Sequence, residues 1–275
     1  MSAVMSPSLV VLTDFFAVSN RALSYAAGLA VPLGAHLVLL HVRHNGLLCP
    51  EEEAAAPTVQ QTRQALYSLA DTQPVPTQVE ISEQVLPTAV TEAIRHHQPQ
   101  LLVLGHPGAE SPLARDFAKA ALNLLHHVRF PLLLVPPPGW DAFPPRRVLL
   151  ALDGEPFSLY DSQQILPHLL QALQGILALV HVTDSTVPSP AASQVLRMVR
   201  TSGLAESLTA EQVHLVPQTT SVAADIQRVS GELNADMLVL IARPHSVLDG
   251  LTHRRSTAQL LRESAIPVLL LPALS

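Results

Sequence analysis

Apolar and polar positions follow one order in two distant stretches of the chain. In residues 100–136, the apolar runs 101–104 and 132–135 flank a segment whose apolar positions repeat at the helical period. In residues 236–272 the same order returns, with a proline-containing loop after the first apolar run. Each stretch therefore predicts a buried strand, a loop, an amphipathic helix and a second buried strand.

Three landmarks recur at nearly constant spacing, which indicates an internal duplication. The pairs, with their offsets in residues, are Asp14 and Asp153 (139), His41 and His181 (140), and Pro131 and Pro267 (136). Near-equal offsets in one order predict two copies of a domain of about 135 residues, a length that can bury its own core.

Within each copy, strands and helices alternate along the chain. The strands expected in the first copy are 9–13, 35–42, 77–81, 101–104 and 132–135, and those in the second include 148–152, 176–182, 213–216 and 237–241. Helices are expected at 20–33, 58–70, 88–97, 158–173, 191–208 and 222–233. This alternation predicts an α/β fold with a parallel, doubly wound sheet in each copy. Ligands of such sheets bind beyond the carboxyl ends of the strands, where Asp14 would approach the loop 105–108.

A proline-rich connector separates the two copies. Prolines cluster at 136–138 and at 144–145, on either side of Trp140 and Phe143. Such a stretch is stiff and interrupts regular structure. We therefore predict a first domain at 1–138, a linker at 139–145 and a second domain at 146–275.

Composition and charge narrow the class of protein. The 275 residues are 48% apolar and 14% charged, which is typical of globular domains with well-filled cores. Residues 1–140 contain seven basic and ten acidic residues, and residues 141–275 contain nine and twelve, so each half has a net charge of −3. This balance argues against a nucleic-acid partner. No apolar run is long enough to span a bilayer, no secretory signal is evident, and Cys49 has no second cysteine to pair with. We expect a cytoplasmic protein that does not contact membranes.

Several of these features resemble the universal stress protein (UspA) family, over nearly the whole chain and in its tandem, two-domain form. The residues that carry the resemblance are Thr13-Asp14, Leu40-His41-Val42, Leu102-Val103-Leu104-Gly105 with Gly108, Asp153, His181-Val182, Leu238-Val239-Leu240 and Ile266-Pro267-Val268-Leu269. The resemblance implies five-stranded sheets of order 3-2-1-4-5, as in adenine nucleotide alpha hydrolases. It also implies that the fifth strands pair or pack, so that the two halves form an internal pseudo-dimer.

The resemblance also implies how ATP would be held. The family's loop, GxxG followed after nine residues by G and S or T, lets backbone N–H groups close round phosphates. Gly105 and Gly108 would belong to that loop, Asp14 would contact the ribose, and Val42 would lie by the adenine. Lys119 follows Ala118 where Gly and Ser or Thr are expected. It is either a charge that replaces lost donors or a solvated helix residue.

The second half keeps no glycine at the three motif positions. Ile241, Pro244 and Arg254 stand there, and side chains at such positions block close approach of phosphate. Arg254 and Arg255 either hold an anion at a helix start or are solvated surface residues. We expect no ATP in this half and at most an ATP site in the first.

Catalytic and metal sites have little support in the sequence. There is no GxSxG elbow and no Walker lysine motif. The histidine pairs 96–97 and 126–127 are adjacent on predicted helices, so their side chains diverge and cannot chelate one ion. His41 and His181, at equivalent strand ends, are expected to be hydrogen-bonded framework residues. Asp153 is expected to cap local backbone.

The sequence thus predicts a non-enzymatic module of the stress response with degraded ATP motifs. It would act through a protein partner that the sequence does not identify, and whole chains could associate further as a homodimer. The alternative is a universal stress protein that binds, and weakly hydrolyses, ATP in the first domain only, through Asp14, Val42, Gly105, Gly108 and Lys119.

Overall fold

The computed structural model describes residues 6–13, 17–43, 59–137, 143–160, 164–183, 191–204, 208–243 and 250–274. In the first half, strands and helices alternate. They are β1 (Ser8–Thr13), α1 (Ala17–Leu33), β2 (His36–Val42), α2 (Val59–Asp71), β3 (Thr77–Ser82), α3 (Leu86–His97), β4 (Leu101–Gly105), α4 (Ala114–Val128) and β5 (Leu132–Val135).

The second half repeats this order with one additional short strand. Its elements are β6 (Arg147–Leu152), β7 (Ser158–Leu159), α5 (Ile165–Leu173), β8 (Ile176–Thr183), α6 (Ala192–Thr201), a 3-10 turn (Ala210–Gln212), β9 (Val213–Pro217), α7 (Val222–Glu232), β10 (Met237–Ala242), α8 (Gly250–Glu263) and β11 (Val268–Leu274). The predicted α/β fold is confirmed. The helix expected at 158–173 begins only at Ile165, because Ser158 and Leu159 pair with the end of β11 instead.

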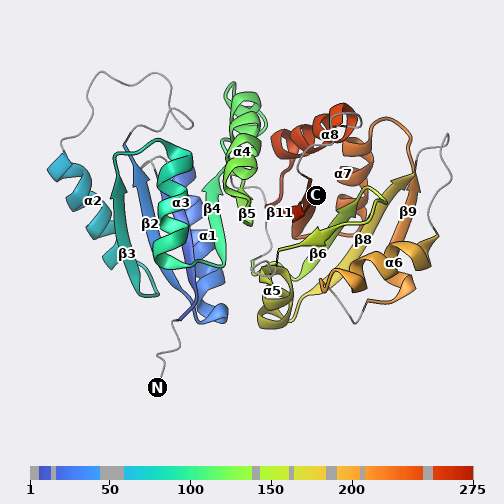
Figure 1. Cartoon of the computed structure of the whole chain (residues 1–275), viewed down its shortest axis with the longest axis horizontal. Helices are drawn as coiled ribbons and strands as arrows, with labels where there is room; N and C mark the ends of the chain where they lie inside the picture. Colours follow the sequence, from blue (N-terminus) through green and yellow to red (C-terminus); the bar gives the residue numbers. More distant parts are fainter. Residues whose placement is uncertain are drawn as a thin grey trace.

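One sheet runs through the whole molecule. Its strand order is β3-β2-β1-β4-β5-β11-β10-β6-β8-β9, so each half has the order 3-2-1-4-5 when its strands are counted along the chain without the short β7. Within a half, neighbours are parallel except for the short β7, which is antiparallel to β11. Between the halves, β5 and β11 are antiparallel, with Leu133 opposite Leu269. The fifth strands therefore pair edge to edge, and the two expected sheets are joined into one (Figure 1).

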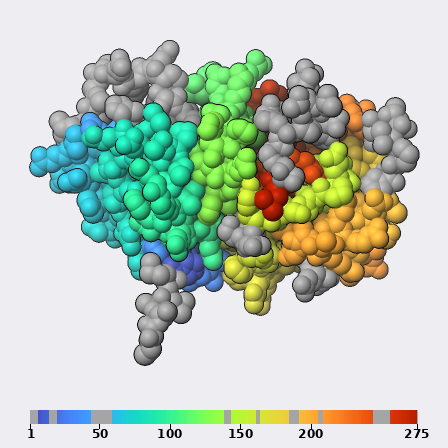
Figure 2. All heavy atoms as spheres, viewed as in Figure 1, coloured from blue at the N-terminus to red at the C-terminus, as the bar shows by residue number. Residues whose placement is uncertain are grey.

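Helices cover both faces of this sheet and bury two cores. Along β1, Leu9 and Val11 pack into a core with α1, α2, α5 and α6, whereas Val10 and Leu12 pack into a core with α3, α4, α7 and α8. This alternation explains the continuous apolar runs in the sequence, since a strand covered on both faces has no polar side. Each core contains residues of both halves, and Figure 2 shows the two halves meeting along the middle of the molecule.

The connector packs where the halves meet. Phe143 lies edge-on to Tyr25 of α1, with the ring centroids 5.1 Å apart. Its ring also lies over Gly28, where a Cβ atom would come within 2.2 Å of the ring. Within the described helices, none is both long and apolar enough to cross a membrane.

Candidate functional site: the carboxyl edges of the strands

In the first half, β1 lies between β2 and β4, and the chain leaves these strands at one edge of the sheet. Thr13 ends β1, Val42 ends β2 and Gly105 ends β4. The connection after β1 runs to one side and the connection after β4 to the other, which makes this edge the place where a doubly wound fold binds ligands. Asp14, expected to contact ribose, lies outside the described residues. Val42 is 4% exposed and belongs to the core that includes α3 and α4.

A histidine ties the second strand to the first in each half. His41 Nδ1 donates to the backbone carbonyl of Thr13 at 2.9 Å, and His181 Nδ1 donates to that of Leu152 at 2.9 Å. The prediction that these two histidines are hydrogen-bonded framework residues is confirmed. Their ring protons are used within the fold.

The loop after β4 satisfies many of its own backbone donors. The N–H of His106 bonds to the carbonyl of Val135 at 2.7 Å, and the N–H of Gly108 bonds to Nδ1 of His106 at 2.9 Å. Further on, the N–H groups of Ser111 and Ala114 bond to carbonyls within the loop, and that of Leu113 bonds to the Ser111 hydroxyl. These are donors that a phosphate-binding loop would turn toward its ligand.

Gly108 is required here by the fold itself. Its φ angle is +92°, a conformation that residues with a Cβ rarely adopt, and a Cβ atom would lie 2.8 Å from Cγ of Pro137. The ring of Pro137, just beyond β5, thus packs against the glycine. Gly105, by contrast, is the buried last residue of β4, paired with Val135.

His106 is a residue of this loop that the sequence analysis did not single out. It is 2% exposed, and its ring lies edge-on to Phe117 of α4 with centroids 5.0 Å apart. Burial lowers its pKa to about 4, although the backbone carbonyl of Leu261 in α8 acts in the opposite direction. Leu261 belongs to the second half, so this ring lies at the junction between the halves. Its position directly after a buried strand was the only signal in the sequence.

Lys119 lies in the second turn of α4. Its Nζ is 3.3 Å from a carboxylate oxygen of Asp116, and both side chains are largely exposed, that of Lys119 at 69%. Ala118 beside it is buried in the core. The structure therefore places Val42 and Gly105 at the ends of β2 and β4, the two strands on either side of β1, and Gly108 in the loop after β4, while the Lys119 side chain faces solvent.

In the second half, an arginine spans the equivalent edge. Asp153 directly follows β6 and Arg243 directly follows β10. Arg243 donates to both carboxylate oxygens of Asp153, from Nε at 2.7 Å and from Nη2 at 2.9 Å. It also donates to the backbone carbonyls of Pro156 and Glu155, at 2.8 and 2.7 Å. This fork geometry is the strongest common arrangement of a guanidinium and a carboxylate.

Electrostatics keep the Arg243 guanidinium charged. Burial lowers the pKa of the Arg243 guanidinium, but hydrogen bonds and charge from Asp153, with the charge of Glu155, outweigh it and hold the pKa above its ordinary value. Asp153 also accepts from the N–H of Glu155 at 3.0 Å, so its expected role as a local cap is confirmed. Beside it, Gly154 has a φ of +86°, and a Cβ atom there would lie 2.7 Å from the ring of His181. Side chains of the protein thus fill this edge.

Comparison with models of protein families shows to which family the chain belongs. The model of the universal stress protein family matches residues 5–136 and 145–272. The chain belongs to the universal stress protein family. Both halves of this universal stress protein match the same model, in agreement with the duplication read from the sequence and with the repeated strand order of the sheet.

Solved structures share the tandem fold. A universal stress protein from Archaeoglobus fulgidus DSM 4304 is 17% identical with a TM-score of 0.67, and the match covers 97% of this chain and 98% of that one. A functionally unknown protein from Pseudomonas aeruginosa PAO1 is 16% identical with a TM-score of 0.56, covering 97% and 92%. The cytoplasmic domain of a prokaryotic cation chloride cotransporter is 13% identical with a TM-score of 0.50, covering 98% and 96%. No curated protein matches the chain.

The remaining candidates of the sequence analysis fall in two groups. Pro244 and Cys49 lie outside the described residues, as do the side chains of Arg254 and Arg255, whereas Ile241 is part of β10. Over the described part of the chain, no three side chains of the metal-ligating kinds are grouped to hold an ion. His97, for example, contacts Glu80 of β3 at 2.6 Å.

Proposed function

We propose that this universal stress protein is a non-enzymatic regulatory module of the stress response, in which neither half uses ATP. The observation that carries the proposal is the Arg243 fork on Asp153. By the family resemblance, the aspartate after the first strand would hold the ribose of a nucleotide. In the second half, both of its carboxylate oxygens already accept from Arg243. The residues present there do not fit a nucleotide.

The loop of the first half supports the same conclusion. The N–H of Gly108 donates to His106, and Pro137 packs against the glycine on the side where a Cβ would lie. Lys119 pairs with Asp116 on the exposed surface of α4 instead of replacing lost donors. A triphosphate would have to break local hydrogen bonds before it gained its own, and each such bond contributes about 1 kcal/mol.

We extend the proposal to the protein's surroundings. A net charge of −6 disfavours the phosphate backbone of nucleic acids, so a protein partner, or a second copy of the tandem chain, is the expected form of association. We propose the cytoplasm as its location, and residues 139–145 as the linker between the domains.

Titration calorimetry with ATP and Mg²⁺ tests the proposal. We expect no saturable heat at millimolar ATP and no phosphate release above a protein-free blank. Saturable binding at micromolar ATP would contradict it. In that case, Lys119→Gln and Arg243→Gln would locate the site, since weaker binding in Lys119→Gln alone would establish the first-domain alternative. Both side chains are at least partly exposed, and thermal unfolding of each variant would verify that it is folded.

A further inference from the structure

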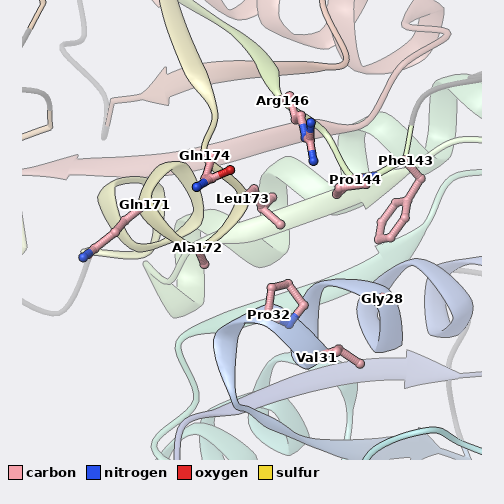
Figure 3. Close-up of a pocket in the computed structure, with 10 residues that line it drawn as sticks. All are labelled: Gly28, Val31, Pro32, Phe143, Pro144, Arg146, Gln171, Ala172, Leu173 and Gln174. Carbon is pink, nitrogen blue, oxygen red and sulfur yellow. The ribbon is translucent and has the colours of Figure 1, made fainter.

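A separate cavity lies on the opposite edge of the sheet. It has a volume of about 440 Å³ and opens between the C-terminal ends of α1 and α5, beside the connector (Figure 3). Because α1 leads into the start of β2 and α5 into the start of β8, the cavity is at the amino ends of the strands. It is therefore distinct from the carboxyl edges described above. Its volume lies within the range of roughly 300–1,000 Å³ that is usual for small-molecule sites.

Apolar side chains form the walls of the cavity. Val31 is 58% exposed and Phe143 40% exposed, and Pro144 and Leu173 also line it. The Phe143 ring is held in place, since it lies edge-on to Tyr25 and directly over Gly28. Exposed apolar side chains grouped in a concave surface mark binding sites more often than isolated ones do.

A cation lies at the rim. Arg146 is exposed and lines the cavity, and Figure 3 shows its side chain extending toward the space between Leu173 and Pro144. Its backbone N–H donates to Asp236 at 3.0 Å, which fixes its main chain, while the adjacent Arg147 takes the ion pair with that carboxylate. Among the described residues, no acidic side chain pairs with the Arg146 guanidinium. A cation that has no counter-ion in the described part of the chain, beside an apolar wall, favours an anion.

The helix ends at the cavity are partly satisfied by the chain itself. Carbonyls at the C-terminus of a helix carry partial negative charge. Here the carbonyl of Val31 accepts from the N–H of Gly34, and that of Leu170 accepts from the N–H of Gly175. These bonds satisfy part of each helix end, and among the residues that line the cavity Arg146 is the one that carries a full charge.

We propose that this cavity binds a small aromatic anion, a flat apolar ring that bears one acidic group. The ring would lie against Phe143 and Val31, and the acidic group would accept from the Arg146 guanidinium. Since α1 belongs to the first half and α5 to the second, such a ligand would contact both halves at once. This site is independent of the nucleotide question at the carboxyl edges.

Three probes that share the naphthalene ring system and differ in charge test the site in the full-length protein. They are naphthalene-2-carboxylate, 2-naphthylmethanol and 2-naphthylmethylammonium, titrated by calorimetry. We expect the carboxylate to bind one per chain, roughly five- to tenfold more tightly than the alcohol, as one charge-assisted hydrogen-bonded contact provides. The ammonium should bind most weakly. Arg146→Gln should remove the advantage of the carboxylate and leave the alcohol unchanged, while Arg63→Gln on the distant α2 should change neither.

A second variant tests the wall. Phe143→Ala should lower the affinity for all three probes by a similar factor, because all three contact the Phe143 ring. Equal affinities for the three probes, or the same result for Arg146→Gln and Arg63→Gln, would overturn the proposal. The proposal would also be overturned if sedimentation showed a dimer that binds no probe and that Phe143→Ala dissociates. In that case a second copy of the chain would cover the cavity.

Discussion

His106 links the loop after β4 to the second half of the chain. Its ring accepts from the N–H of Gly108, lies against Phe117 and meets the backbone of Leu261 in α8. Because Nδ1 is an acceptor, the neutral ring carries its proton on Nε2. A protonated ring would carry a donor on both nitrogens, lose the bond from Gly108 and place a charge in an apolar environment. The folded state therefore requires the neutral form.

We predict that His106 makes stability fall with acidification between pH about 6.5 and 4. In this window the unfolded chain binds a proton, because an ordinary histidine has a pKa of 6.5, while the folded chain excludes it until about pH 4. The unfolded state then binds more protons, so the free energy of unfolding decreases as pH falls, by on the order of 3 kcal/mol in total. Urea unfolding at pH 7, 5.5 and 4 measures it.

The matched control for this prediction is His106→Asn. The Asn side-chain oxygen can accept from the N–H two residues ahead, as Nδ1 does now, but the amide does not titrate. The variant loses contacts with Phe117, so the pH dependence is compared and not the absolute stability. If the wild type and His106→Asn lose stability in parallel from pH 7 to 4, the ring does not account for the pH dependence.

In the candidate site, only contacts between residues close together in the sequence were predictable. The cap that Asp153 forms on the N–H of Glu155 spans two residues, and it was expected from an aspartate at a strand end. The Arg243 fork on the same carboxylate joins residues 90 apart, after the first and fourth strands of the half. The family resemblance implied that these strands are neighbours, but no sequence pattern showed that a side chain after one would bind the aspartate after the other. Gly108 was recognised as a motif residue. That a side chain there would collide with Pro137, which follows β5, was visible only in the structure.

Helices and strands were predictable where apolar positions repeat within the segment itself. They were less predictable where the segment pairs with residues far away in the sequence. The strands of both halves and their parallel order follow from apolar runs separated by helical segments. The helix predicted at 158–173 begins at Ile165, since residues 158–159 form β7 against Ala273 and Leu274. That partner is more than 110 residues away, so helical periodicity alone placed the boundary too early.

At the scale of elements, we predict opposite effects for two glycine-to-alanine changes in helices. Gly231 in α7 has nothing within 4 Å of a built Cβ, so Gly231→Ala should stabilise the protein by up to about 1 kcal/mol. Gly28→Ala gains the same helix propensity, but its Cβ would displace the Phe143 ring, and overpacking costs about 1–3 kcal/mol. Thermal unfolding should therefore show a higher Tm for Gly231→Ala than for Gly28→Ala. Equal gains would mean that Phe143 does not pack on α1.

For the molecule as a whole, the pairing of β5 with β11 makes two duplicated domains into one structure. The four residues of β5 are all buried, and an unpaired apolar edge of this kind would associate with other chains. The sequence predicted that the fifth strands meet, from the family resemblance. The antiparallel register, with Leu133 opposite Leu269, and the cores that extend across it were visible only in the structure.

We predict that the two halves unfold as one cooperative unit. Leu39 in β2 is fully buried in the core that also contains Leu179 of β8, in the other half. Leu39→Ala should lower the free energy of unfolding by about 2–5 kcal/mol. If the molecule unfolds cooperatively, the opening free energy of every core amide falls by the same amount. Hydrogen exchange should show protection in β8 falling by the same amount as in β2. Unchanged protection in β8 would show that the second half opens independently and that the continuous sheet does not couple the two domains.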